Sequence, residues 1–409
     1  MKSPISLAPL HHSNFRWLWA GLSASYAGDR LQELAQAWLV AGLTQSSALA
    51  VGWISILASI PQLFMPLGGV IADRVDRRKL LIGGQLAGAC IAAVVGGLVL
   101  SGTVLPWHIY AWAFISGIVW LFSRPAFKVI LTEVVPENEV RSAVALNSTT
   151  ETTATTTVNL FGSFLLAWIG LPVAFVLNAI SYLIAAGGLW RVTGVDQQIT
   201  ATSRRISVKG VSSDLKDGIA FLIHQPGLLY PLLLTFLTVM ISTPAVGLLA
   251  AIIHKRGGSI ISLGLMIASA GVGSIAGAMY AGLHNEGSKP VHRYGWFGIG
   301  AAVAFGLFIF APFSFITPLP LAAIGFILFS ETVWNTSRVR LSANSAFQAR
   351  LQSLTTMAFT LGTAFGQLWG GIVIDRFGIK GLAGGAILLC FLSIWALLVT
   401  RQQNIMFQG

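Results

Sequence analysis

The chain has 409 residues, of which 55% are hydrophobic and only 10% are charged, and its mean hydropathy is +0.76. Soluble domains carry charge on roughly a quarter of their residues, so this composition excludes an ordinary soluble protein and indicates a polytopic membrane protein. The formal net charge of +11 does not indicate a nucleic-acid partner, because the basic residues are scattered singly between apolar runs and form no continuous patch.

Twelve apolar runs are each about as long as the 20 helical residues that cross a hydrocarbon core of about 30 Å. Six runs precede a polar segment, 191–227, and six follow it. That segment carries five basic residues among Ser, Thr and Gly, which is typical of a cytoplasmic linker. The predicted spans are 15–41, 48–72, 80–101, 107–130, 143–168, 171–190, 228–252, 260–283, 295–312, 319–338, 354–374 and 381–400.

We therefore expect an all-α polytopic membrane protein with twelve transmembrane helices in two six-helix bundles. The bundles are predicted to cover 1–190 and 228–401, joined by the linker 191–227 and followed by a tail, 402–409. The tail ends in Phe407-Gln408-Gly409, which resembles the remnant of a protease site on an expression tag. We therefore leave that end out of the fold prediction.

The distribution of basic residues predicts that both ends of the chain face the cytoplasm. With the N-terminus inside, two of the 25 Lys and Arg lie within spans (Arg30 and Arg124), four lie outside (Lys255, Arg256, Arg376 and Lys380), and the remaining 19 are cytoplasmic. This asymmetry follows the positive-inside rule. The first apolar run is long and contains charged residues, so we expect no cleavable signal peptide.

Six charges are compressed into the turn between the second and third spans, at 69–79. This segment resembles the helix 2–3 loop of the major facilitator superfamily, Gly-x-x-x-Asp-Arg-x-Gly-Arg-Arg/Lys. It matches the loop at Gly69, Asp73, Arg74, Arg77 and Arg78, whereas Asp76 stands where the family usually has glycine.

The resemblance implies a gating role for this loop. In the family, the residues that match Asp73, Arg74 and Arg77 bind across to the other half and hold the cytoplasmic gate shut. Asp73 could also cap the start of the eleventh span, where free backbone N–H groups carry partial positive charge. The alternative is a topology signal alone, although positive residues would suffice for that purpose.

Two further patterns suggest that the halves are related. Trp120-x-x-x-Arg124, near the end of the fourth span, recurs as Trp334-x-x-x-Arg338 near the end of the tenth. Such corresponding places are expected of two halves related by an axis along the membrane normal, and we group Arg124 and Arg338 with the gating residues. Glycines at intervals of four, which allow close helix contact or sliding, occur at Gly273 and Gly277 and at Gly362, Gly366 and Gly370.

Short motifs between the fourth and seventh spans refine the resemblance. The segments 124–126, 135–139, 145–148 and 217–221 are similar to the enterobactin-exporter-like and multidrug branch of the superfamily. The stretch 158–163 lacks the proline of the Gly-Pro-x-x-Gly-Gly pattern that drug-exporting antiporters usually carry in helix 5.

Four acidic residues fall inside predicted spans, namely Asp29, Glu33, Glu151 and Glu331. A charge at the bilayer centre costs at least about 2.5–3.5 kcal/mol on insertion scales, so each needs a partner, a water-filled cavity or a function. Asp29 and Glu33 are four residues apart and share a helix face. Such a pair can hold one proton between its members, which suits proton coupling. The alternative is a structural ion pair of Asp29 with Arg30 or Arg124.

The fifth span carries a polar stripe of Asn147, Glu151, Thr155 and Asn159 at intervals of four. A stripe of this kind would be poorly solvated by lipid, so we expect it to line a central cavity. Threonine hydroxyls can instead bond back to the carbonyl four residues earlier. Glu151 is either a proton or substrate-cation site in that cavity or one member of a buried pair with Arg124.

The tenth span repeats this theme with Glu331, Trp334, Asn335 and Arg338 on one helix face. A carboxylate beside an indole ring can hold an organic cation. Trp334 and Arg338 could equally be anchors at the membrane interface, where both residue types are common.

These features predict a secondary active transporter of the bacterial inner membrane. It would export an amphipathic small molecule, drug-like or siderophore-like, in exchange for protons as two bundles rock about a central site. The alternative transport function is proton-coupled uptake of a siderophore or another nutrient. A membrane-embedded enzyme has little support, because the sequence lacks His-x-x-x-His, Gly-x-Ser-x-Gly and nucleotide-loop motifs. We expect a monomer in the lipid bilayer, with the substrate and protons as its partners and no metal or cofactor.

Overall fold

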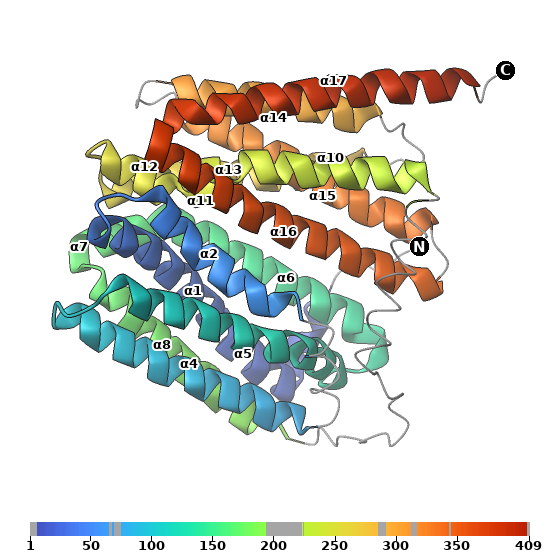
Figure 1. The fold of residues 1–409 in the computed structure, drawn as a ribbon. Coiled ribbons are helices and arrows are strands. Elements are labelled where there is room, and N and C mark those ends of the chain that lie inside the picture. Colours follow the sequence, from blue (N-terminus) through green and yellow to red (C-terminus); the bar gives the residue numbers. More distant parts are fainter. Residues whose placement is uncertain are drawn as a thin grey trace. The chain divides into compact units, whose positions relative to one another are not determined.

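The computed structural model describes residues 6–64, 68, 75–193, 223, 225–284, 292–311, 317–342 and 345–406. Within these ranges the regular structure is entirely helical, with no strand, so the all-α prediction is confirmed. The chain divides into two compact units, shown in blue to green and in yellow to red in Figure 1 except at residues 44–56. The N-terminal unit comprises Met1–Leu43 and Leu57–Ile206, and the C-terminal unit comprises Thr44–Ile56 and Ser207–Gly409.

Five of the first six predicted spans coincide with a helix or with consecutive helices. Of the second span, α2 covers 48–62, and residues 65–67 and 69–72 lie outside the described residues. The fifth span is interrupted by a π-helical segment, η3, which separates α6 from α7. Single π turns widen a helix locally and often occur at functional sites. This segment occupies the place where the superfamily pattern has its proline. The elements are η1 (Ala8–His11), α1 (Ser13–Leu43), α2 (Ala48–Gln62), α4 (Arg77–Leu100), α5 (Pro106–Glu133), η2 (Glu137–Glu139), α6 (Val140–Thr157), η3 (Val158–Gly162), α7 (Ser163–Ile169) and α8 (Pro172–Arg191).

The last six predicted spans also coincide with helices. The seventh is broken near Pro244, because proline lacks the N–H that would continue the helical ladder. Nine helices in the described part of the chain are long and apolar enough to cross a membrane. The elements are α10 (Pro226–Ser242), α11 (Pro244–Gly247), α12 (Leu249–Lys255), α13 (Ile260–Leu283), α14 (His292–Phe310), α15 (Pro318–Ser342), α16 (Ser345–Phe377), η4 (Ile379–Leu382) and α17 (Ala383–Met406).

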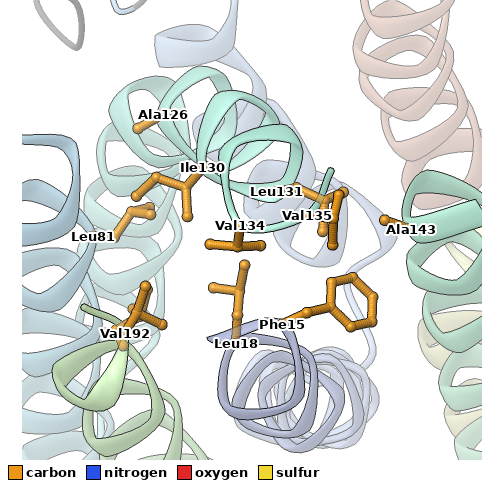
Figure 2. Packing of buried hydrophobic residues seen from close by; sticks show 11 residues of the cluster. Phe15, Leu18, Leu81, Ala126, Ile130, Leu131, Val134, Val135, Ala143 and Val192 are labelled. Atoms are coloured by element: carbon orange, nitrogen blue, oxygen red, sulfur yellow. The ribbon is translucent and has the colours of Figure 1, made fainter. Parts of the chain in front are cut away.

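The buried core shown in Figure 2 lies at one end of the N-terminal unit. Phe15 and Leu18 come from the start of α1 and Leu81 from the start of α4, whereas Ile130 and Val134 come from the end of α5. Residues from the start of α6 and the end of α8 complete the cluster. The first, third and fifth spans therefore begin, and the fourth and sixth end, on the same side, as an up-and-down bundle requires.

Close helix contacts at small residues confirm the glycine pattern of the C-terminal unit. A Cβ atom on Gly277 of α13 would lie 2.1 Å from the carbonyl oxygen of Phe326 on α15. Gly366 of α16 approaches α10 similarly, with its Cβ position 2.5 Å from the carbonyl oxygen of Met240. Backbone contact of this kind supplies packing where lipid gives no hydrophobic drive between helices.

Candidate functional site

Asp29 lies in a hydrogen-bonded network between α1 and α8. Its Oδ1 accepts a hydrogen bond from the Tyr182 hydroxyl at 2.5 Å and one from Asn178 Nδ2 at 3.3 Å. Asn178 Nδ2 also donates to Gln32 Oε1 at 2.7 Å. Asn178 and Gln32 are 1% and 2% exposed, so the carboxylate group faces a buried polar layer inside the helix bundle.

The close approach of α1 and α8 depends on a glycine beside Asp29. A Cβ atom on Gly28 would lie 2.4 Å from both Asn178 Oδ1 and Ser181 Oγ. A larger residue at this position would displace the Asn178 and Ser181 side chains and so disturb the hydrogen bonds around Asp29.

Asp29 and Glu33 do not share a partner. Glu33 Oε2 accepts a hydrogen bond from Arg30 Nη1 at 2.6 Å, and its side chain is 51% exposed. The guanidinium group of Arg30 reaches Glu33 because residues three apart are neighbours on a helix. In this structure Arg30 pairs with Glu33, whereas the half-buried carboxylate of Asp29 is hydrogen-bonded to Tyr182 and Asn178. Sharing of a proton between Asp29 and Glu33 stays a prediction.

A small cavity adjoins Asp29. Its volume is about 50 Å³, and its wall includes Ser25, Asp29, Gln85 and Tyr182. The Oε1 atom of Gln85 is buried and has no hydrogen-bond partner among the described residues. A cavity of this size has room for water, which would complete the hydrogen bonds of these groups.

The polar side chains of the fifth span lie on two faces of α6, and the stripe of Asn147, Glu151 and Thr155 occupies one of them. Asn147 is 8% exposed, and its Oδ1 accepts a hydrogen bond from the Tyr26 hydroxyl at 3.3 Å. Thr155 donates back to the carbonyl oxygen of Glu151 at 2.9 Å, as predicted for threonine. Asn159 lies within η3. The other face is exposed and polar, and it consists of Ser148, Thr149, Thr152 and Thr153.

Glu151 and Arg124 do not form the close pair that was one alternative. The Arg124 guanidinium group lies over the Trp120 ring at 4.1 Å from its centroid. Glu151 acts on Arg124 electrostatically, but the ion pairs within 4.0 Å found in the described part of the chain do not include Glu151. The carboxylate of Glu151 is half-buried and near positive charge without being neutralised by direct contact.

Glu331 is fully buried in the C-terminal unit. Its side chain is 0% exposed, and neither carboxylate oxygen has a hydrogen-bond partner in the described structure. The Thr235 side chain is a polar neighbour that interacts with the carboxyl group, although neither carboxylate oxygen meets the distance and angle criteria of a full hydrogen bond. The Thr235 hydroxyl accepts a hydrogen bond from Asn335 Nδ2 at 2.7 Å. A buried charge without such partners is costly, so this position favours a group that can become neutral.

Trp334 belongs to an enclosed aromatic cluster. Its ring is 4.7 Å from that of Phe297, 5.9 Å from that of Tyr294 and 6.1 Å from that of Tyr280, measured between centroids. The residue is 7% exposed, so protein encloses its ring in this conformation. The two expected roles, as an interfacial anchor and as a face for a cation, stay predictions. Arg338 lies 5.5 Å from the centroid of the Tyr294 ring. The two Trp-x-x-x-Arg motifs therefore have different contacts.

Part of the loop at 69–79 is described, and Gly69, Asp73 and Arg74 lie outside the described residues. Arg77 Nη1 pairs with Glu133 Oε1 at 2.8 Å. The Arg78 guanidinium group donates to the carbonyl oxygens of Leu189, at 3.0 Å, and Trp190 at the end of α8. Both arginines thus have partners within the N-terminal unit, and their role across the halves stays a prediction.

The departure of Asp76 from the family pattern has a local explanation. Asp76 is the N-cap of α4, and its Oδ1 accepts a hydrogen bond from the backbone N–H of Lys79 at 3.1 Å. Aspartate is among the preferred N-cap residues because its side chain satisfies a free N–H of the first turn. Asp76 therefore has a structural role at this position, as the cap of α4.

An apolar groove runs along η3 in the N-terminal unit. Its volume is about 820 Å³, within the range of small-molecule sites. Phe161 and Trp168 on its wall are 65% and 85% exposed, and Gly28 and Ser181 connect its floor to the Asp29 network. Asn178 and Tyr182 were not among the predicted site residues, although two polar residues four apart in the apolar sixth span were a usable signal.

Comparison with known proteins places these features in a family. Residues 4–404 match the family described as transmembrane secretion effector. Macrolide efflux protein A of Streptococcus pyogenes is 23% identical over 402 residues, which cover 92% of this chain and 93% of the relative. Multi-drug resistance efflux pump PmrA of Streptococcus pneumoniae is 26% identical over 229 residues, covering 55% of this chain and 54% of that protein.

Solved structures show a similar fold. A bacterial homologue of the iron transporter ferroportin, in an inward-facing state, superposes with a TM-score of 0.69 at 14% identity, over 96% of this chain and 99% of that one. The nucleoside transporter NupG also gives a TM-score of 0.69, at 12% identity, over 93% of this chain and 98% of that chain.

Proposed function

Because the chain belongs to the transmembrane secretion effector family of the major facilitator superfamily, we propose that this transporter exports an amphipathic small molecule in exchange for protons. The two units would alternate in access about a central site. Macrolides are the first substrate class to test, since macrolide efflux protein A matches nearly the full length of this chain.

The observation that best supports this proposal is that the carboxyl group of Glu331 is fully buried and has no full hydrogen bond among the described residues. Such a carboxyl group is stable at membrane depth when it holds a proton and unstable when it loses one. Its protonation is therefore linked to whether water can reach it. A conformational change that opens the surroundings of Glu331 would let the proton leave, which is the requirement for coupling.

Asp29 and Glu151 supply further acidic positions in the N-terminal unit. The cavity beside Asp29 has room for water, and a proton could reach the carboxylate through it. Glu151 is near Arg124 without a direct ion pair, so it stays available to a proton or a substrate cation. Glu33 has a weaker claim because Arg30 neutralises it.

Substrate recognition would combine the polar face of α6 with the apolar groove along η3. Exposed hydroxyls at membrane depth need water or protein cover, which an aqueous cavity would supply to Ser148 and Thr152. The groove would take the apolar part of the molecule. This division suits an amphipathic compound better than a small hydrophilic nutrient, and export is favoured over uptake because the relatives named above are efflux proteins.

The orientation follows from the charges at one end of the N-terminal unit. The helix ends that meet at the core of Figure 2 carry basic residues, namely Arg16, Arg77, Arg78, Lys79, Lys128, Arg141 and Arg191. The positive-inside rule places such an end in the cytoplasm. We therefore expect the described N-terminal end of the chain to be cytoplasmic, in the bacterial inner membrane.

The test is transport in proteoliposomes with a radiolabelled macrolide. An imposed pH gradient should drive accumulation by the unaltered protein, and Glu331→Gln, Asp29→Asn and Glu151→Gln should each reduce it. Exchange of macrolide at equal pH should persist in these variants, because exchange needs no net proton movement. Glu137→Gln, on the exposed η2, is the matched control. Normal gradient-driven accumulation in all three variants would show that these carboxylates do not couple transport to protons.

The direction is tested with membrane vesicles of opposite orientation. Export predicts accumulation in inside-out vesicles under a gradient that is acidic inside. Accumulation by right-side-out vesicles instead would establish uptake.

A further inference from the structure

The first turn of α2 is capped by a residue more than 300 positions away. Asp375, at the end of α16, accepts hydrogen bonds from the Ser47 hydroxyl at 2.6 Å and from the backbone N–H groups of Ala48 and Leu49 at 2.8 and 3.1 Å. The Ser47 hydroxyl in turn accepts the N–H of Ala50 at 3.1 Å. The first three N–H groups of α2 are thus satisfied by Asp375 and Ser47, and a negative charge is favourable at this end of a helix.

The backbones of the two helices touch one turn below this cap. A Cβ atom on Gly371 of α16 would lie 2.6 Å from Leu49 Cα, and one on Gly52 of α2 would lie 3.0 Å from the carbonyl oxygen of Gln367. This seam, formed by Gly371 and Gly52, leaves no space for side chains between α2 and α16. The contact around Asp375 is therefore tightly packed as well as hydrogen-bonded.

The turn that leads into α2 is also held by this contact. Gln45 and Ser46 have φ values of 51° and 66°, in the left-handed region that residues with side chains rarely adopt. The Ser46 hydroxyl is hydrogen-bonded to His254 Nδ1 at 2.7 Å. Residues in this region persist where the surrounding structure imposes them, so the turn should relax when α2 leaves α16.

The residues of the cap repeat the pattern of the charged loop. Gly371-x-x-x-Asp375-Arg376 has the spacing of Gly69-x-x-x-Asp73-Arg74. The copy at 371–376 contacts the start of α2, where Asp375 accepts the N–H of Ala48. The copy at 69–74 follows the other end of the same helix in the sequence. The chain therefore carries the same short motif at both ends of one membrane-spanning segment.

We propose that Asp375 is a gating residue, which holds the outer end of α2 against α16 in one state and releases it in the other. Residues 44–56 pack as part of the C-terminal unit, while the chain from Leu57 belongs to the N-terminal unit. A helix shared in this way must change its contacts if the units move. The inference rests on the alternating access proposed above, but it does not depend on the substrate or on proton coupling.

The test measures how often the outer end opens. Ser55→Cys, about two turns after Ala48, is introduced into a Cys90→Ser, Cys390→Ser background and labelled from outside with a membrane-impermeant maleimide. Asp375→Ala should raise the labelling rate about fivefold, which is the factor that loss of an N-cap typically brings to an equilibrium. Asp375→Asn and Ser47→Ala should raise it less, because each keeps part of the hydrogen bonding. Arg376→Ala, at the exposed neighbouring position, is the matched control.

A labelling rate for Asp375→Ala and Asp375→Asn equal to that of Arg376→Ala would overturn the proposal. If Asp375→Ala does not fold, as judged by gel filtration, Asp375→Asn and Ser47→Ala decide the question. Because maleimide labelling needs neither macrolide nor a pH gradient, a failure of proton antiport would leave this result intact. Faster labelling of Asp375→Ala without proton-driven transport would support the gate while rejecting proton antiport. Unchanged labelling would reject the gate itself.

Discussion

Gly273 of α13 and Ala322 of α15 meet backbone to backbone. A Cβ atom on Gly273 would lie 1.8 Å from the Ala322 carbonyl oxygen, and Gly277 and Gly325 continue the same contact. Since carbonyl groups of a helix cannot turn aside, the contact allows no side chain on α13 at these positions. The packing of these two helices therefore requires glycine at these positions, because any other residue would place a Cβ atom against the backbone of the neighbouring helix.

Gly273→Ala should destabilise the C-terminal unit. Forcing one methyl group into a packed contact typically costs about 1–3 kcal/mol, and here the obstacle is backbone. Thermal unfolding in detergent, followed by tryptophan fluorescence, should show a lower midpoint than for the unaltered protein. Gly282→Ala is the matched control, because a Cβ at Gly282 of the same helix meets nothing within 4 Å. Equal midpoints for the two variants would show that α13 and α15 are further apart than described.

Arg78→Ala should weaken the attachment of α8 to the start of α4. The guanidinium group satisfies carbonyl oxygens of Leu189 and Trp190 at the C-terminus of α8, where positive charge is favourable. We expect a loss on the order of 1–2 kcal/mol in the free energy of unfolding, as for hydrogen bonds to a charged group that is partly exposed. Lys79→Ala is the control, because the Lys79 side chain is 84% exposed. Chemical denaturation of both variants measures the difference.

The sequence was sufficient to predict the helical fold because membrane spans have a strong signal. Within the described residues each predicted run coincides with helical structure. The errors concern interruptions, such as the π-helical segment η3 within the predicted span 143–168. Hydropathy averages over about 20 residues and does not detect a single widened turn. The break at Pro244, by contrast, had a visible cause in the sequence.

The acidic residues of the candidate site could be predicted from the sequence, but their hydrogen-bond and ion-pair partners could not. Asp29 and Glu331 stood out because carboxylates are costly in spans. Their environments depend on which helices pack together, so the pairing of Asp29 with Tyr182 on α8 and of Glu33 with Arg30 could not be read from spacing along α1 alone. The rings that enclose Trp334 come from two other helices, so the sequence of the tenth span left its role open between a cation-binding face and an interfacial anchor.

Tyr182→Phe should impair transport through its effect on Asp29. The variant keeps the ring but removes the hydroxyl that donates to Asp29 Oδ1 at 2.5 Å. If the Asp29 network participates in the transport cycle, the initial rate of pH-driven macrolide accumulation should fall severalfold. Tyr230→Phe in α10 is the control, because the Tyr230 hydroxyl has no hydrogen bond in the described structure. Equal rates in both variants would remove Tyr182 from the mechanism.

Glu331 should carry a cost in stability that its function requires. The carboxyl group is fully buried, and both of its oxygens lack hydrogen-bond partners among the residues described. An apolar side chain of similar volume would avoid the penalty of burying an unpaired polar group, which protein mutations place at about 1–3 kcal/mol. Glu331→Met should therefore raise the midpoint of thermal unfolding while abolishing pH-driven accumulation.

The matched control is a substitution at a buried polar group that does have a partner. Asn335 Nδ2 donates to Thr235 Oγ1 at 2.7 Å, and Asn335 is 4% exposed on the same helix. Asn335→Leu leaves Thr235 unpaired, so it should lower the midpoint, because removing one partner exposes the full cost of desolvating the other. A higher unfolding midpoint for Glu331→Met together with a lower midpoint for Asn335→Leu would show that the Glu331 carboxyl group reduces the stability of the protein. A lower midpoint for Glu331→Met would mean that the carboxyl group has a stabilising partner, and the argument for a proton site at Glu331 would then fail.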